Sequence, residues 1–507
     1  MFTINRKQSN HKTLIIFFLS ILVFILIAIV IAVHFLKMNG TSGISKAGES
    51  IGEIYNKATS DVLTYFILND EVIITDCEQS ASGSLAIPDV IEGKPVTSIY
   101  QYAFSDCSKL TNVNIPKTVT SIGENAFRDC TGLKSITIPD SVTSISYAAF
   151  SGCTGLTNIT IPSSLTNIGQ EVFAHCTGLT NISIPSSVKS IDHNAFWDCA
   201  NLTSITIPSS VTSIGEYAFH ECAGLKIFTF PDSVTSIGFR AFFGCTGLTS
   251  ILIPNNITDI AHNVFEGCIN LTSISVAAGN TVYDSRNNCN AIIKTSSNEL
   301  ISGCKNTVIP IDVESIGRQS FSSLSTLTNI IIPDTVTQIG YYAFSESGLT
   351  SITIPQNITT IDDTAFEGCT ELSSINVVDE NEVYDSRNKC NAIIKTSSNE
   401  LIIGCKNTLI PDSVTIMGDN AFRDCTGLTN ITIPNSLTSI SYAAFYGCNG
   451  LRSISIPTSV TFINTSAFEG CVNLADVEYL GSKDEWSQIE IRDDNDDLLK
   501  AKIHYGR

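Results

Sequence analysis

Cysteine recurs at a fixed interval of 23 residues through the first half of the chain. The members of this row are Cys107, Cys130, Cys153, Cys176, Cys199, Cys222, Cys245 and Cys268. Thiols in a regular row can serve as disulfide partners, as metal ligands or as small core residues. A zinc site needs ligands that converge on one point, usually as closely spaced pairs, and the sequence has no Cys-x-x-Cys pair. We therefore expect no metal site.

Packing explains the cysteine row better than covalent chemistry. The same slot holds Leu324 and Ser347 in two repeats, and a slot that accepts cysteine, leucine and serine is a packing slot. Stacked coils would bring neighbouring Cα atoms within disulfide range, but their parallel Cα–Cβ bonds suit a bridge poorly. We expect buried free thiols, although export to an oxidising medium would favour pairing. The predicted core ladder comprises Phe127, Cys130, Phe150, Cys153, Phe173, Cys176, Phe196 and Cys199.

Two enlarged repeats, 267–310 and 368–411, carry cysteines that depart from the 23-residue spacing. The two blocks match at 33 of 44 positions, and each contains AIIKTSSNELI, a predicted β-hairpin that turns at Ser-Ser-Asn. A hairpin would bring its flanking cysteines close together, with free thiols as the alternative. The candidate disulfides are Cys289 with Cys304, and Cys390 with Cys405.

Histidines offer no catalytic pair. The five histidines after the first 40 residues occupy different slots, except that His193 and His262 share one slot three coils apart. Three coils span roughly 14 Å, which is too far for a dyad. The sequence also lacks a phosphate loop, a nucleophile elbow and a zincin motif. We therefore predict no enzymatic activity and no cofactor.

The elements that position these residues follow from one repeat unit, TGLKSITIPDSVTSISYAAFSGC (131–153). Leu-x-x-Ile-x-Ile is typical of the strand of a leucine-rich repeat, and Pro139 ends that strand. A second short extended piece follows, and Ala149 to Cys153 is expected to form one helical turn. The predicted fold is a β-rich leucine-rich-repeat solenoid with short helical turns and a single N-terminal transmembrane helix.

The N-terminal part carries the membrane segment. Residues 14–33 are apolar except for Ser20, and they are long enough to cross a bilayer core. Basic residues precede them, which predicts a cytoplasmic tail (1–13), an uncleaved signal anchor (14–36) and a stalk (37–61). A cleaved signal peptide is the alternative. The remaining boundaries are an N-terminal cap (62–96), the solenoid (97–476) and a C-terminal cap (477–507).

The net charge of −20 argues against nucleic acid as a partner, because phosphate binding needs the opposite sign. The solvent-facing strand positions form an almost uniform field of hydroxyl and amide groups, a broad and multivalent surface. The enlarged repeats are a second candidate for binding. The predicted ligand-contacting positions on the strand face are Lys134, Asn158, Asn181, Lys226, Ile227, Leu252, Ile331 and Arg452.

The units AFRDCTGLKSITIPDSVTSI and AFYGCNGLRSISIPTSVTFI resemble the BspA-like, or Treponema pallidum type, leucine-rich repeats. The resemblance covers roughly residues 72–505 and implies a surface-exposed protein that binds host proteins, other bacteria or matrix. We therefore expect a single-pass membrane protein with an extracellular repeat domain. Its partners would be an extracellular protein or glycoconjugate, and its own membrane through residues 14–36. A self-associating structural protein of the cell envelope is the alternative.

Overall fold

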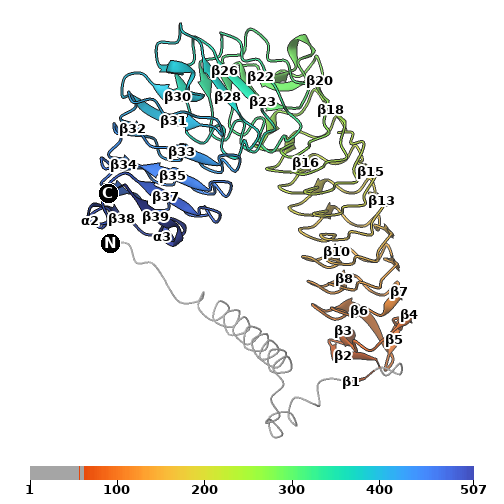
Figure 1. The fold of residues 1–507 in the computed structure, drawn as a ribbon. Helices are drawn as coiled ribbons and strands as arrows, with labels where there is room; N and C mark the ends of the chain where they lie inside the picture. The colour runs from red at the N-terminus through yellow and green to blue at the C-terminus, as the bar shows by residue number, and fades with distance from the viewer. Residues whose placement is uncertain (1–55, 58–61, 507) are drawn as a thin grey trace, which may run out of the picture. The chain divides into compact units, whose positions relative to one another are not determined.

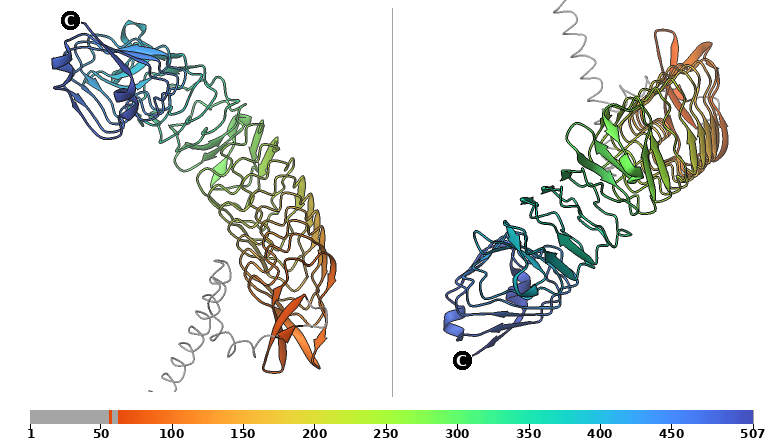
Figure 2. Two further views of the ribbon diagram at one scale, coloured as in Figure 1. Left: turned by 60° about the horizontal axis from the view of Figure 1, so that its bottom comes forward. Right: turned by 90° about the horizontal axis from the view of Figure 1, so that it is seen from above.

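The computed structural model describes residues 56–57 and 62–506, beginning with β1 (Asn56–Lys57). The predicted cytoplasmic tail, the signal anchor and most of the stalk lie outside these residues and stay predictions. Within the described ranges, no helix combines the length and the apolar character needed to cross a membrane. The chain from Lys57 onward forms one compact unit of stacked coils (Figures 1 and 2).

Each 23-residue repeat makes one coil with two short strands. In both strand columns a residue pairs in parallel with its equivalent in the next coil, as Asn158 does with Asn181 and Ser190 with Ser213. The 23-residue spacing is therefore the length of one coil. The first strand column comprises β4 (Gly83–Ala86), β7 (Leu110–Asn114), β9 (Ser135–Thr137), β11 (Asn158–Thr160), β13 (Asn181–Ser183), β15 (Ser204–Thr206), β18 (Ser250–Ile253), β20 (Ser273–Val276), β26 (Ser351–Ile354), β28 (Ser374–Val377), β33 (Asn430–Thr432), β35 (Ser453–Ile456), β37 (Asp476–Tyr479) and β39 (Lys502–Tyr505).

The second strand column follows the proline that ends each first strand. Its buried isoleucine alternates with an outward polar residue, as the period of two requires. Its members are β6 (Lys94–Ile99), β8 (Ser121–Ile122), β10 (Ser144–Ile145), β12 (Asn167–Ile168), β14 (Ser190–Ile191), β16 (Ser213–Ile214), β17 (Ser236–Ile237), β19 (Asp259–Ile260), β24 (Ser315–Ile316), β25 (Gln338–Ile339), β27 (Thr360–Ile361), β32 (Ile416–Met417), β34 (Ser439–Ile440), β36 (Phe462–Ile463) and β38 (Glu490–Ile491).

The segment that closes each coil is a turn, so the expected helical turn at 149–153 is wrong. Ala148 and Gly152 have φ angles of 52° and 73°, which a right-handed helix cannot contain. The backbone N–H groups of Ala148, Phe150 and Gly152 donate to carbonyls of the next coil at 2.8–3.1 Å. Every second N–H therefore joins neighbouring coils instead of extending a helix. Within the described residues, α-helix is confined to α2 (Lys483–Trp486) and α3 (Asp496–Lys500) near the C-terminus.

Phenylalanine and cysteine form the centre of the core, as predicted. From Phe104 to Phe242, successive rings stack at centroid distances of 4.8–5.8 Å. Each ladder thiol is buried and donates to the phenylalanine carbonyl of the preceding coil; for Cys130 and Cys153 these distances are 3.0 and 3.1 Å. Cysteine thus supplies both apolar volume and a weak donor.

The enlarged repeats form hairpins that divide the core into three clusters. In the first, β22 pairs with β23 in antiparallel fashion, with Ala291 opposite Gly303, which confirms the predicted hairpin. Ile292 packs into the N-terminal cluster, whereas Ala291 and Ile293 pack into the middle one. The elements of the two inserts are β21 (Tyr283–Asp284), η1 (Arg286–Asn288), β22 (Ala291–Lys294), β23 (Glu299–Gly303), β29 (Tyr384–Asp385), η2 (Arg387–Lys389), β30 (Ala392–Lys395) and β31 (Glu400–Gly404).

These hairpins separate the cysteines that the sequence offered as disulfide partners. Cys289 belongs to the middle cluster and Cys304 to the N-terminal one, while Cys390 and Cys405 are divided between the C-terminal and middle clusters. All four thiols are free. The two candidate disulfides are therefore corrected, because side chains on opposite faces of a hairpin cannot form a bridge.

The first strands of the N-terminal region, β2 (Leu63–Leu68) and β3 (Glu71–Cys77), form an antiparallel pair that extends the second strand column through β6; β5 (Val90–Ile91) pairs with β6. At the C-terminus, buried Asn495 accepts a hydrogen bond from the Phe468 N–H at 3.0 Å and donates to the Asn464 carbonyl at 2.9 Å. These contacts satisfy backbone groups that the last coil would otherwise leave unpaired.

Candidate binding surface

The first strand column presents a polar face made of repeated hydroxyl and amide groups. Ser135 donates to the Asn112 side chain at 3.2 Å, and Thr180 and Thr203 each donate to a threonine carbonyl one coil earlier at 3.3 Å. Part of this polar field is thus bonded within the molecule along the coil stack. A ligand would meet a regular surface whose chemistry changes little from coil to coil.

All eight strand-face positions predicted from the sequence are exposed: Lys134, Asn158, Asn181, Lys226, Ile227, Leu252, Ile331 and Arg452. The structure does not gather them into one cluster. Lys226 and Ile227 lie one coil before Leu252, since Ile227 bridges to Ser204 on its other side and Leu252 pairs onward with Ser275. The remaining positions are distributed along the stack, and their role in ligand contact stays a prediction.

A stronger apolar feature follows the first insert. Val308 is 71% exposed, and Ile311 and Ile331 are each 79% exposed. Val308 and Ile331 occupy equivalent positions 23 residues apart, and each precedes a buried isoleucine and then a proline. We call Val308, Ile311 and Ile331 the apolar strand-face patch. The coil that stacks on the equivalent strand position of the second insert carries Leu409, which is 74% exposed.

Sequence analysis found Ile331 but missed Val308 and Ile311. The insert replaces the Leu-x-x-Ile signal that marks the start of each strand, so the register was lost there. The signal that remained was Val308-Ile-Pro, which repeats the exposed–buried–proline order of Thr137-Ile-Pro. Two exposed apolar side chains on adjacent coils are a more specific contact point than the surrounding hydroxyl groups.

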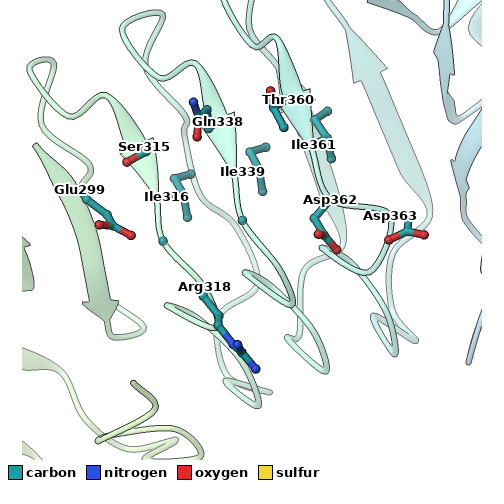
Figure 3. Close-up of a pocket in the computed structure, with 12 residues that line it drawn as sticks. Glu299, Ser315, Ile316, Arg318, Gln338, Ile339, Thr360, Ile361, Asp362 and Asp363 are labelled. Carbon is teal, nitrogen blue, oxygen red and sulfur yellow. The ribbon is translucent and has the colours of Figure 1, made fainter. Parts of the chain in front are cut away.

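A shallow polar groove crosses the second strand column between β23 and β27 (Figure 3). Figure 3 shows Glu299, Ser315, Gln338 and Thr360 side by side on successive strands. Burial raises the pKa of Asp363 at one end of this groove. The groove joins no nucleophile to a base, and within the described residues no three His, Cys, Asp or Glu side chains are placed to hold a metal ion. It carries no catalytic arrangement.

The histidines bond to carboxylates one coil away rather than to each other. His175 Nδ1 lies 3.2 Å from Asp198 Oδ2, and His193 Nδ1 lies 3.5 Å from Glu216 Oε2. However, the structure brings His175 and His220 against Trp197, at ring-centroid distances of 4.9 and 5.7 Å. The sequence treated these residues as unrelated, because they occupy different slots of different repeats.

Comparison with known proteins agrees with this architecture. The model of the BspA type leucine rich repeat region, in six copies, matches residues 97–226, 189–300, 292–396 and 392–488. A leucine rich cell surface protein from Faecalibacterium prausnitzii is 30% identical, with 86% of this chain and 98% of that chain covered and a TM-score of 0.47. Comparison with curated proteins gives no match.

Two further solved structures are similar. The leucine rich repeat protein of T. pallidum is 30% identical over 43% of this chain and 91% of that chain, with a TM-score of 0.34. The pneumococcal vaccine antigen PcpA is 16% identical over 89% of this chain and 97% of that chain, with a TM-score of 0.38. Since the family model spans most of the solenoid, the chain belongs to the BspA-type leucine-rich repeat family.

Proposed function

We propose that this chain is a membrane-anchored extracellular protein that binds an extracellular protein or glycoconjugate through its strand face. The observation that supports the binding role most directly is the apolar strand-face patch, because such side chains are otherwise confined to the core. The printed description of the F. prausnitzii relative as a cell surface protein supports the location. The apolar segment at residues 14–33 supports the anchor.

The patch suits a contact of limited size within a larger polar interface. Burying an exposed Val or Ile side chain contributes about 1.5–3 kcal/mol, and the polar positions around it add complementarity rather than much energy. Repeated equivalent positions along the stack let a long or repetitive ligand make several such contacts. Binding should therefore depend strongly on the patch and weakly on any single hydroxyl.

A screen of the full-length chain against host-cell proteins, bacterial surfaces and glycans tests this role. The double variant Val308→Thr and Ile331→Thr installs the residue type that other coils carry at this position. It should weaken any saturable interaction about tenfold or more, because two apolar contacts are removed. Val472→Thr, at a side chain that is 69% exposed elsewhere, is the matched control and should leave binding unchanged. Absence of saturable binding throughout, or equal losses in both variants, would contradict the proposal.

Self-association is the second candidate, because the same exposed patch could face a second copy of the chain. Sedimentation velocity across a range of protein concentrations distinguishes the two. Concentration-dependent assembly that the double variant abolishes, without binding to any outside ligand, would favour a structural role in the envelope. Surface biotinylation of intact cells tests the location separately, since labelled repeat-domain lysines require exposure outside the membrane.

A further inference from the structure

Six consecutive coil-closing turns stack into a second surface, which we call the turn ridge. It comprises segments 124–130, 147–153, 170–176, 193–199, 216–222 and 239–245. Backbone hydrogen bonds hold these turns in register; the Asp198 N–H donates to the His220 carbonyl at 2.8 Å, and the Tyr217 N–H donates to the Phe239 carbonyl at 2.9 Å. Side chains from equivalent positions therefore line up coil by coil.

Aromatic side chains meet along this ridge. His220 stacks on Phe243 at 4.6 Å and contacts Tyr217 at 5.4 Å, while Tyr217 contacts Phe239 at 5.4 Å. All of these rings, with Trp197, are partly exposed. Trp, Tyr and Arg are the residue types that dominate binding hot spots, and the strand face has few of them.

Packing alone does not account for the group. The Trp197 indole nitrogen and His220 Nδ1 are buried and have no hydrogen-bond partner among the described residues. Buried polar atoms are usually paired, and an unpaired one costs stability. A cluster that served only to stabilise the coils would be expected to satisfy these atoms or to use phenylalanine instead.

The ridge already binds one guanidinium group, its own. Arg240 lies over the Phe243 ring at 4.8 Å and over the Phe239 ring at 5.4 Å. Its Nη2 lies 2.9 Å from Oε2 of the largely buried Glu266. A cation held between aromatic rings and a carboxylate is a favourable arrangement. It shows which kind of group the neighbouring rings and carboxylates can accept.

The charge of the ridge leaves room for further cations. Its six segments contain six carboxylates and two guanidinium groups. Both guanidinium groups are paired within the molecule, Arg128 with Asp129 and Arg240 with Glu266. Burial lowers the pKa of His220, so that its ring is neutral at neutral pH. The ridge is therefore acidic around its aromatic centre, and the chain as a whole carries a net charge of −20.

We infer that the turn ridge binds an arginine- or lysine-bearing segment of a partner protein. The cationic side chains lie over Trp197 and Tyr217, and their charges face the carboxylates of Asp198, Glu216 and Glu221. Charge complementarity selects this partner, because an acidic segment or a polyanion would be repelled. The ridge uses different residues from the strand face, so this interaction does not depend on the proposed function.

Intrinsic fluorescence tests the inference, because the chain has only two tryptophans, Trp197 and Trp486. In the full-length Trp486→Phe variant, Trp197 is the sole reporter and lies in the ridge. Titration with an oligoarginine peptide at low salt should give a saturable change in its emission, and an oligoglutamate peptide should give none. The Asp198→Asn and Glu221→Gln substitutions, introduced together, should weaken binding about tenfold or more.

The matched control is the pair Asp232→Asn and Asp334→Asn, which removes two exposed carboxylates from loops outside the ridge. This control should keep the affinity within about twofold, whereas general attraction to an acidic protein would weaken both variants equally. Equal weakening, or the absence of a saturable change in Trp197 emission, would overturn the inference. Circular dichroism establishes that each variant keeps its fold.

Discussion

Alkylation of thiols in the native and the unfolded chain tests whether the cysteine row is a packing column. All 17 cysteines of the chain are buried and free in the structure. We expect no ladder thiol to react in the native chain at pH 8. After unfolding in guanidinium without any reductant, all 17 should react. The two numbers together separate burial from covalent pairing.

The size of the protection can be worked from one ladder position. Burial raises the pKa of Cys176 from 9.0 to about 12, although a hydrogen bond from the Cys153 backbone opposes this shift. Three pH units lower the thiolate fraction about 1000-fold, and the thiolate is the reactive species. The side chain is also fully buried, so reaction must wait for local opening of the coil. Native labelling should therefore be slower by at least about three orders of magnitude.

The same raised pKa makes a statement about stability. A buried thiol stays protonated in the folded chain above pH 9, where it ionises in the unfolded chain. The contribution of the ladder is therefore complete below about pH 9 and is lost as the pH rises toward the folded value. The chain should lose stability in alkali, and substitution of Cys176 by alanine should reduce that loss in urea unfolding.

The assay is mass spectrometry of the chain after reaction with iodoacetamide, with peptides assigned by digestion. Thirteen reactive thiols in the unreduced, unfolded chain, which is four fewer than 17, would indicate the two disulfides that the structure excludes. A fully oxidised ladder would refute the packing interpretation. Rapid native labelling of Cys176 would refute the argument from burial and ionisation.

Three further predictions concern the core and the inserts. Phe196→Ala should lower the free energy of unfolding by about 3–5 kcal/mol, because its buried ring stacks on both neighbours in the ladder. Arg286→Ala should cost about 1–2 kcal/mol in urea unfolding, since Arg286 donates to both carboxylate oxygens of Asp284 in a partly exposed pair. Burial opposes the effect, but hydrogen bonds from Arg286 hold the pKa of Asp284 below 3.8, so this loss should shrink below about pH 4 as Asp284 protonates in both states. Gly303→Ala should cost about 1–3 kcal/mol or more, because its Cβ would lie 2.1 Å from Cε1 of Phe321.

Each of these predictions has a control within the chain. Phe196→Leu keeps most of the buried volume and should cost less than the alanine variant. Gly169→Ala should be nearly neutral, because the nearest atom to its Cβ would be 3.4 Å away. A pH-independent cost for Arg286→Ala would contradict the role of the Asp284 carboxylate. Equal costs for the two glycine variants would show that contact with Phe321 is not the cause.

The 23-residue repeat determined most of the fold from the sequence alone. A coil that repeats with one length must place equivalent residues in columns, so the buried Phe127 and Cys130 and the exposed Lys134 followed from spacing. The hairpins of the enlarged repeats followed from alternating residues around a short polar turn. These features are local or periodic, and for that reason one sequence is enough to predict them.

The closing turn of each coil depended on information that the repeat pattern does not contain. Ala148 adopts a positive φ although alanine disfavours it, because neighbouring coils fix the turn through hydrogen bonds on both sides. The faces of Cys289 and Cys304 depended likewise on a bulge and a register that local sequence does not specify. Contacts between coils outweigh the local preference in both cases.

The sequence by itself therefore determined the stacked-coil architecture, the buried ladder and the polar strand face. Only the tertiary structure decided which side chains from different coils meet. The insert carries Val308 beside Ile331, and the stacked turns bring Trp197, His220 and Arg240 into one acidic and aromatic ridge. A repeat unit specifies where each residue stands within its own coil. The chemistry of a surface arises across coils, from irregular residues that the periodic pattern leaves unassigned.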